Sequence, residues 1–174
     1  MAITFQLILP TEIDSLGEWL CQERWPYHGR EQLTRDQFRA DVDQGVYFGD
    51  TVRSFWILES EERIGFIRLF DLEDMTPLFD LRIRSDMRGK GIGRLAVNWL
   101  TDEIFRNWAH VRRIEAYTRA DNVPMQRVLI ACGYRKEAHH RKAWPDQAGN
   151  YHDSVGYAIL KEEVTDCRKE SDNA

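Results

Sequence analysis

A glycine-rich segment, RGKGIG at residues 88–93, separates a strand pattern from a long helix pattern, and it constrains the fold more than any other feature. Before it, apolar residues alternate along Pro77–Ile83, as in a strand with one buried face. After it, apolar residues recur at helical spacing from Ile92 to Ile104, and Arg113–Thr118 reads as another strand. A strand, a helix and a second strand in this order predict a right-handed crossover between parallel strands.

The patterns on either side of this crossover predict antiparallel strands and shorter helices. Further strands are expected at Ile3–Leu9, Val52–Leu58, Arg63–Phe70, Tyr134–Ala143 and Tyr151–Leu160. Further helices are expected from Thr11, from Thr34 and over Asn122–Cys132. The sequence therefore predicts an α/β fold with a single mixed, mostly antiparallel, seven-stranded sheet and flanking helices.

The length of 174 residues suits one domain. We expect residues 1–163 to form it and residues 164–174, in the charged C-terminal stretch, to fray. The three cysteines are far apart and odd in number, which indicates free thiols in a reducing compartment. The N-terminus has no basic region before its short apolar run, and no apolar stretch approaches the length of about 18 residues that a membrane span needs. A cytoplasmic protein is expected.

The formal net charge is −5, which argues against bulk nucleic-acid binding and agrees with a cationic substrate. Residues 82–94 are a local exception. Five basic residues and one acid in this stretch give it a formal charge of +4, since 5 − 1 = 4. We therefore expect an anion to bind at this stretch.

The glycine-rich segment has the features of a phosphate site. Glycines let a ligand approach the backbone closely, and the first turn of a helix offers unpaired N–H groups and a positive dipole end. A P-loop would need Ser or Thr after Lys90, and the dinucleotide fingerprint would need Gly at position 94, but the sequence has Gly91 and Arg94 there. The pattern Arg-x-x-Gly-x-Gly fits. Taken alone, it can also be a turn without a ligand.

Two segments together resemble the GNAT superfamily of acyl-CoA-dependent N-acetyltransferases. The first is residues 88–93, because Arg/Gln-x-x-Gly-x-Gly/Ala binds the CoA pyrophosphate in that family. The second is NVPMQRVLIACGY at Asn122–Tyr134, which begins with Asn and runs through a short helix to Gly-Tyr. The spacing within this second segment, and GNYHDSVGYAILKEE near the C-terminus, are similar to the branch that acetylates ribosomal-protein N-termini.

The resemblance implies acetyl-CoA as co-substrate, no metal, and direct attack of a primary amine on the thioester. It also implies that the parallel strands splay to admit the pantetheine arm. The residues implied in CoA binding are Leu81, Arg82, Ile83, Arg88, Gly89, Lys90, Gly91, Ile92, Gly93, Arg94, Asn122 and Arg127. No nucleic acid or membrane is expected as a partner, and a homodimer is one option for the assembly.

Asp80 is the predicted general base, because it lies on the polar face of the strand before the loop. The alternative is a solvated carboxylate paired with Arg68 or Arg82. The thiolate has no usual acid: Leu129 stands where many members have Tyr, and Met125 stands where the ribosomal-protein branch often has Ser. Tyr117 is one substitute, and unassisted or water-assisted departure is another.

The loop after the first helix holds Trp25, Tyr27 and His28, which are predicted to line the acceptor site. The alternative is that these rings cap the core. The acceptor itself is left open between a small molecule, such as a polyamine or an amino antibiotic, and a protein N-terminus. A CoA-binding sensor without transferase activity is the alternative function, favoured by the missing acid. A protein that binds ATP or NAD is a third reading.

Overall fold

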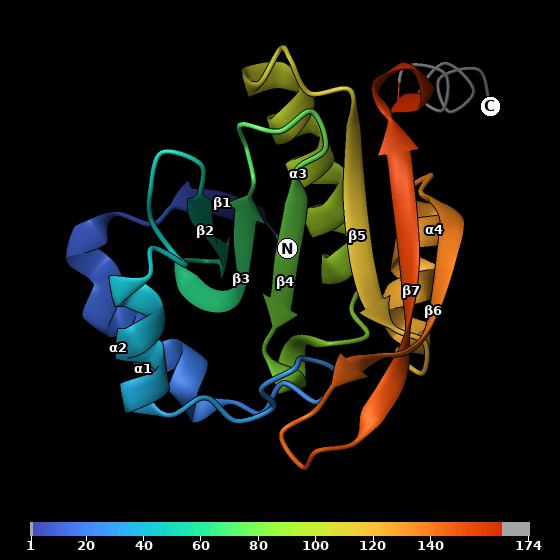
Figure 1. Ribbon diagram of the computed structural model, residues 1–174. Coiled ribbons are helices and arrows are strands. Elements are labelled where there is room, and N and C mark those ends of the chain that lie inside the picture. Colours follow the sequence, from blue (N-terminus) through green and yellow to red (C-terminus); the bar gives the residue numbers. More distant parts are fainter. Residues whose placement is uncertain (1, 165–174) are drawn as a thin grey trace.

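The computed structural model describes residues 2–164 (Figure 1). Its strands are β1 (Ile3–Leu7), β2 (Arg53–Glu59), β3 (Glu62–Phe70), β4 (Leu78–Ile83), β5 (Arg113–Arg119), β6 (Arg135–Pro145) and β7 (Tyr151–Leu160). Its α-helices are α1 (Ile13–Gln22), α2 (Arg35–Asp43), α3 (Ile92–Asn107) and α4 (Val123–Ala131). Two short 3-10 helices are η1 (Pro10–Glu12) and η2 (Ser85–Met87).

The seven strands form one sheet in the order β1-β2-β3-β4-β5-β7-β6. Only the central pair, β4 with β5, is parallel, and the other neighbours are antiparallel. The predicted α/β fold with a mixed, mostly antiparallel, seven-stranded sheet is therefore confirmed. The crossover from β4 through α3 to β5 lies at the centre of the sheet (Figure 1).

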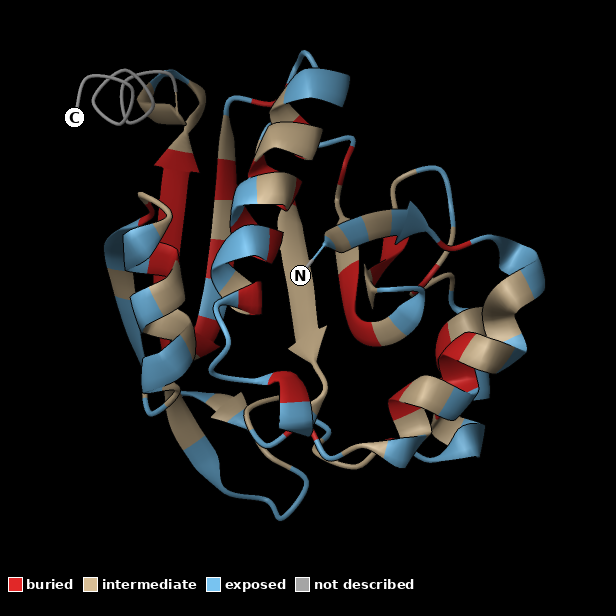
Figure 2. Cartoon of the chain, turned by 180° about the vertical axis from the view of Figure 1, so that it is seen from behind, coloured by how far each residue is buried: buried red, intermediate tan, exposed pale blue. Residues whose placement is uncertain are grey.

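Two clusters of buried side chains lie on opposite faces of the sheet, because neighbouring residues of a strand point to opposite sides. Ile67 belongs to the cluster under α3 and α4, whereas the adjacent Phe66 belongs to the cluster with α1 and α2. Helices α3 and α4 cover the side seen in Figure 2. The face of β4 that carries Phe79, Leu81 and Ile83 packs against the α3 cluster, as its alternation predicts.

Strands β4 and β5 diverge after their first residues. Their only register pair is Leu78 with Glu115, whereas β3 and β4 pair along the whole of β4. The remaining residues of β4, including Leu81–Ile83, thus have no strand partner on the β5 side. Figure 1 shows the resulting V-shaped opening between the two strands. The splay implied by the resemblance is present.

The capping pattern predicts the start of α2 correctly but not the start of α1. Thr34 caps α2 and exchanges hydrogen bonds with Gln37, as the capping pattern predicts. The first helix was expected to start at Thr11 with Asp14 as capping partner, but Glu12 accepts from the Leu9 N–H instead. The chain turns earlier because the fixed backbone of Pro10 opens a short 3-10 turn there.

The C-terminal end of the described chain stays on the sheet. Lys161 donates from its backbone to the carbonyl of Arg112, and Val164, the first residue of the expected tail, packs against the α3 cluster. The rest of that tail, residues 165–174, lies outside the described residues. Within residues 2–164, no helix is both long enough and apolar enough to cross a membrane.

Candidate active site

A pocket of about 390 Å³ opens beside the splayed strands, within the size range of small-molecule sites. Its walls come from the loop between α1 and α2, from β3, β4 and β5, and from Trp144 at the end of β6. The loop is held across the pocket by the β6–β7 turn, because Gln32 and Gln147 exchange two hydrogen bonds of 2.9 Å. Segments far apart in the sequence thus enclose one cavity.

Asp80 lies in this pocket between two partners. Its Oδ1 is 3.0 Å from His28 Nε2, and its Oδ2 accepts from Arg82 Nε at 3.2 Å and Arg82 Nη2 at 3.1 Å. Burial opposes ionisation, but the Arg82 charge and the His28 contact outweigh it and hold the pKa of Asp80 well below 3.8. Asp80 is therefore an ionised, paired carboxylate, whose side chain is only 15% exposed.

The ionised state of Asp80 fixes the proton on His28. A carboxylate only accepts hydrogen bonds, so the facing Nε2 of His28 carries the proton and Nδ1 has a free lone pair. Burial and the Arg82 charge lower the pKa of His28 below 6.5, against the opposing effect of Asp80. The ring is therefore neutral at pH 7, and its buried Nδ1 has no hydrogen-bond partner within residues 2–164.

The glycine-rich loop presents a row of free backbone donors at the start of α3. Gly91 caps the helix at φ 82° without a side-chain cap, and Gly89 also has a positive φ of 76°. In the described chain, the N–H groups of residues 89–93 donate to no protein acceptor. A Cβ added at either glycine would meet no atom within 4 Å, so the space in front of the loop is open. The loop fits a bound pyrophosphate.

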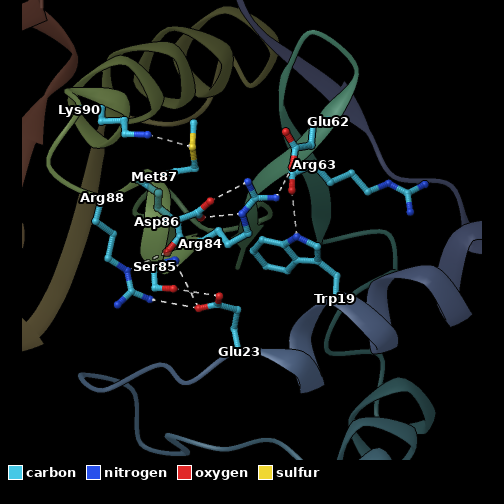
Figure 3. Close-up of polar contacts among 11 residues, drawn as sticks. Trp19, Glu23, Glu62, Arg63, Arg84, Ser85, Asp86, Met87, Arg88 and Lys90 are labelled. Atoms are coloured by element: carbon cyan, nitrogen blue, oxygen red, sulfur yellow. Dashed lines mark hydrogen bonds and ion pairs between the residues drawn. The ribbon is translucent and has the colours of Figure 1, made fainter.

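Figure 3 shows that acids offset part of the positive charge expected at residues 82–94. Arg84 pairs with Asp86 at 2.7 Å and with Glu62 at 2.6 Å. Arg88 donates to the carbonyl of Ile83 at 2.8 Å and lies 3.9 Å from Glu23. Within residues 2–164, Lys90 and Arg94 form no ion pair, so these two cations remain to face an anion.

Helix α4 supports the loop from the other side. The side chain of Val128 lies 3.4 Å from where a Cβ of Gly93 would be, so this glycine lets α3 approach α4 closely. Asn122 caps α4 by accepting from the Met125 N–H, and it donates to Thr118 at 2.9 Å. Asn122 therefore has a structural role, and its contact with CoA stays a prediction. Arg127 is exposed on α4, next to Val128.

Comparison with known proteins identifies the family. The family model for the acetyltransferase (GNAT) domain matches residues 3–135, which is most of the chain. The chain belongs to the GNAT acetyltransferase family. It is an acetyl-CoA-dependent N-acetyltransferase, with acetyl-CoA as co-substrate and an amine as acceptor. A comparison with curated proteins gives no match.

Solved structures share the fold of this acetyltransferase. A spermidine N-acetyltransferase from Vibrio cholerae, in complex with CoA and spermine, has a TM-score of 0.75 at 17% identity, covering 94% of this chain and 98% of that one. A probable acetyltransferase has a TM-score of 0.73 at 21% identity, covering 92% and 94%. A dodecameric spermidine N-acetyltransferase from Vibrio cholerae has a TM-score of 0.73 at 18% identity, with the same coverage of 92% and 94%.

The three residues predicted to line the acceptor site of this acetyltransferase lie in two different places. Tyr27 and His28 line the pocket. Trp25, predicted to line it as well, is instead 1% exposed in the α1–α2 cluster and donates to the carbonyl of Leu20. The guanidinium groups of Arg82 and Arg88 lie over its ring, 5.4 Å and 5.8 Å from the centroid. Trp25 is therefore a core residue, which was the alternative to a place in the acceptor site.

The two positions that lack the usual acid have different surroundings in this acetyltransferase. Leu129 is fully buried in the α3 cluster, whereas Met125 lines the pocket. Tyr117 also lines the pocket and donates to Glu115 at 3.2 Å. Burial and the Glu115 charge raise the pKa of Tyr117, so its hydroxyl stays protonated at neutral pH. In this structure that proton is held by Glu115.

Sequence reasoning missed two contributions to this pocket. The sequence indicates a wall position for His28 and Arg68 or Arg82 as the partner of Asp80, but not the hydrogen bond between His28 and Asp80, which are 52 positions apart. It indicates Arg68 only as a partner of Asp80, although Arg68 lines the pocket and forms no ion pair within residues 2–164.

Proposed function

We propose that the chain acetylates the primary amine of a small molecule held in the pocket beside Asp80, with His28 as the proton acceptor. The observation that carries this proposal is the hydrogen-bonded pair His28–Asp80, 3.0 Å apart, at the mouth of the splayed strands. A neutral imidazole oriented by a carboxylate is a common general base. Asp80, the base predicted from the sequence, becomes the group that orients His28.

Acetyl-CoA supplies an activated acetyl thioester, and several features of the chain favour its binding. The free N–H groups of residues 89–93 and the charges of Lys90 and Arg94 suit a pyrophosphate. The unpaired edge of β4 at Leu81–Ile83 suits the amide groups of a pantetheine arm. We assign Arg88, Asn122 and Arg127 to the rim of the same site.

The proton transfer starts at His28. Its Nδ1 takes a proton from the acceptor ammonium, and Asp80 stabilises the imidazolium that forms. The amine lone pair then attacks the thioester carbonyl carbon, so that the N–C bond forms as the C–S bond breaks and sulfur leaves with the electron pair. The nitrogen then releases its second proton, which reaches the thiolate through a water molecule or through the Tyr117 hydroxyl.

Leu129 and Met125, which leave the thiolate without its usual acid, suggest a CoA-binding sensor, but the acetyltransferase family of the chain replaces that alternative. One alternative acceptor rests on a specific feature. A protein N-terminus as acceptor is favoured by the similarity of the Asn122–Tyr134 segment to the ribosomal-protein branch. We favour a small amine because the loop between α1 and α2, which Gln32 and Gln147 join to the β6–β7 turn, forms one wall of a pocket of small-molecule size.

A cytoplasmic location and self-association, with a homodimer as one option, complete the proposal. Cys21 and Cys132 are free thiols, which supports a reducing compartment. The dodecameric relative supports self-association of this fold without favouring a dimer. Sedimentation of the purified chain measures its assembly directly.

Replacing Tyr27 with Ala should raise KM for the amine by about 5- to 30-fold, because an aromatic wall contact is worth roughly 1–2 kcal/mol. KM for acetyl-CoA should stay nearly constant, since Tyr27 lines the pocket while the pyrophosphate loop begins at Arg88. Steady-state kinetics with each substrate varied in turn measures the split. Equal weakening for both substrates would assign Tyr27 to the core instead.

The pH dependence of kcat/KM should report His28. The base acts in its neutral form, and its pKa lies below 6.5, so this ionisation should reduce activity only as the pH falls below 6.5. The ionisation of the amine adds a second limb at higher pH, which moves with the amine used. A first limb that also moves with the amine would show that no enzyme base acts there.

A further inference from the structure

The acceptor pocket is lined by the residues whose buried side-chain polar atoms lack a hydrogen-bond partner among the described residues. Within residues 2–164, three buried side-chain atoms have no hydrogen-bond partner: His28 Nδ1, Arg68 Nε and Trp144 Nε1. All three residues line this one pocket. Buried polar atoms in native proteins are nearly always paired, so this convergence indicates a ligand that completes them.

The three atoms define the chemistry of that ligand. Arg68 Nε and Trp144 Nε1 are donors only, so they need acceptor atoms. His28 Nδ1 is an acceptor, because its Nε2–H already faces Asp80, so it needs a donor. A molecule that carries both an ammonium group and an anionic oxygen group matches the donor and acceptor types of all three.

The charges around the pocket also favour an anionic group on the ligand. Three arginines line it, and two of them are paired: Arg30 with Asp41, and Arg82 with Asp80. Among the described residues, Arg68 is the pocket cation without an ion pair. It donates one hydrogen bond, to the carbonyl of Val46 at 3.2 Å, and its guanidinium lies 4.5 Å from the Phe70 ring centroid. The ring contact and this bond hold the cation in place without an acidic group at ion-pair distance, while its charge helps to lower the pKa of Asp80.

The register of the sheet places the two ends of such a ligand close together. Arg68 on β3 is directly opposite Asp80 on β4, and side chains of opposite residues in an antiparallel pair share one face. Their Cβ atoms are then about 5 Å apart. The ammonium and the anion of one small molecule can therefore reach His28 and Arg68 together.

We propose that the acceptor is a small amine that carries a carboxylate, of the amino-acid class, with the ammonium at His28 and the carboxylate on Arg68. This inference rests on the proposed function. It departs from the spermidine N-acetyltransferases with the same fold, because a polyamine would place a second ammonium beside the unpaired Arg68. It also reverses the expectation of a cationic substrate, because the net charge of −5 belongs to the whole chain and the free charge in the pocket is positive.

Matched amines test the carboxylate. Leucine, methionine and phenylalanine are each compared with their amides and decarboxylated amines, and spermidine is added, at saturating acetyl-CoA with thiol release as readout. After correction for the fraction of each amine in the ammonium form that His28 deprotonates, kcat/KM of each free acid should exceed that of its counterparts without a carboxylate by about 10- to 100-fold, as for a hydrogen bond to a charged group. Equal or faster turnover of the amides, the decarboxylated amines or spermidine would overturn the proposal.

Arg68→Gln should remove this preference. It should lower kcat/KM for the free acids by about 10- to 100-fold and leave the amides unchanged. Arg63→Gln is the matched control, because Arg63 is on the same strand, lies over Trp56 at 4.7 Å and is outside the pocket. Arg68→Lys, which keeps the charge but loses Nε, should recover part of the preference. An unchanged preference in Arg68→Gln would contradict the role of Arg68.

Failure of the proposed function has a different signature. In that case no amine of any class releases thiol, although acetyl-CoA still raises Tm. The anion site is then tested by binding: with CoA present, N-acetylleucine should raise Tm of the wild-type chain and of Arg63→Gln, but not of Arg68→Gln. Absence of a shift in the wild-type chain would overturn the anion site as well.

Discussion

Replacing Gly91 with Glu should abolish the thermal stabilisation that acetyl-CoA gives to the wild-type protein. Gly91 caps α3 beside the free N–H groups of residues 89–93, so a carboxylate there competes with the pyrophosphate. Acetyl-CoA at about 100 times its Kd contributes about 2.7 kcal/mol, or roughly 5–10 °C in Tm for a chain of this size. Melting with and without acetyl-CoA measures the loss.

Gly149→Glu is the matched control for this variant. Gly149 has φ 84°, close to the 82° of Gly91, and a Cβ added at either position meets no atom within 4 Å. The backbone strain of the two substitutions is therefore similar, but Gly149 lies in the turn between β6 and β7. Gly149→Glu should keep the full shift. If Gly91→Glu also kept the full Tm shift with acetyl-CoA, the glycine-rich loop would be a turn that binds no pyrophosphate.

Replacing His28 with Gln should lower kcat by about 10²–10⁴-fold, the usual contribution of a general base. Glutamine can still donate to Asp80, so the pocket keeps its hydrogen bond but loses the lone pair of Nδ1. The Tm shift with acetyl-CoA should remain, because His28 lies outside the glycine-rich loop. Activity and melting on the same preparation separate the two effects.

Asp80→Asn gives a readout that a purely structural role would not move. The Asp80 charge raises the pKa of His28, so its removal should shift the acid limb of the pH–rate profile to lower pH while kcat falls. His139→Gln is the control, because His139 bonds Asp153 at 2.7 Å in a similar pair away from the pocket.

For the His28→Gln variant, a kcat equal to that of the wild-type chain would exclude an imidazole base.

The fold was predictable because its signals are local. Each pattern depends only on how a single strand or helix packs against the core. Both the alternation of Phe79, Leu81 and Ile83 and the helical repeat after Gly91 are confirmed. The order of strand, helix and strand then leaves one handedness for the crossover. The glycine-rich loop was readable for the same reason, since its donors belong to consecutive residues.

The acceptor site was less predictable because its contacts are distant in sequence. Nothing local indicates that His28 meets Asp80, or that Arg68 lacks an acidic partner. Trp25 and Tyr27 are both aromatic residues of one loop, yet one is in the core and the other lines the pocket. Only the path of the loop, tied to the β6–β7 turn, separates these two positions.

We expect one chain to transfer an acetyl group from acetyl-CoA to an amine held in this pocket. The most direct test quantifies both products of a single reaction, free CoA thiol and N-acetylated amine, with the wild-type chain and with His28→Gln. We predict that the wild-type chain forms the two products in equal amounts, and that the variant forms neither at a comparable rate. Thiol without acetylated amine, or tight binding of acetyl-CoA without either product, would contradict the account.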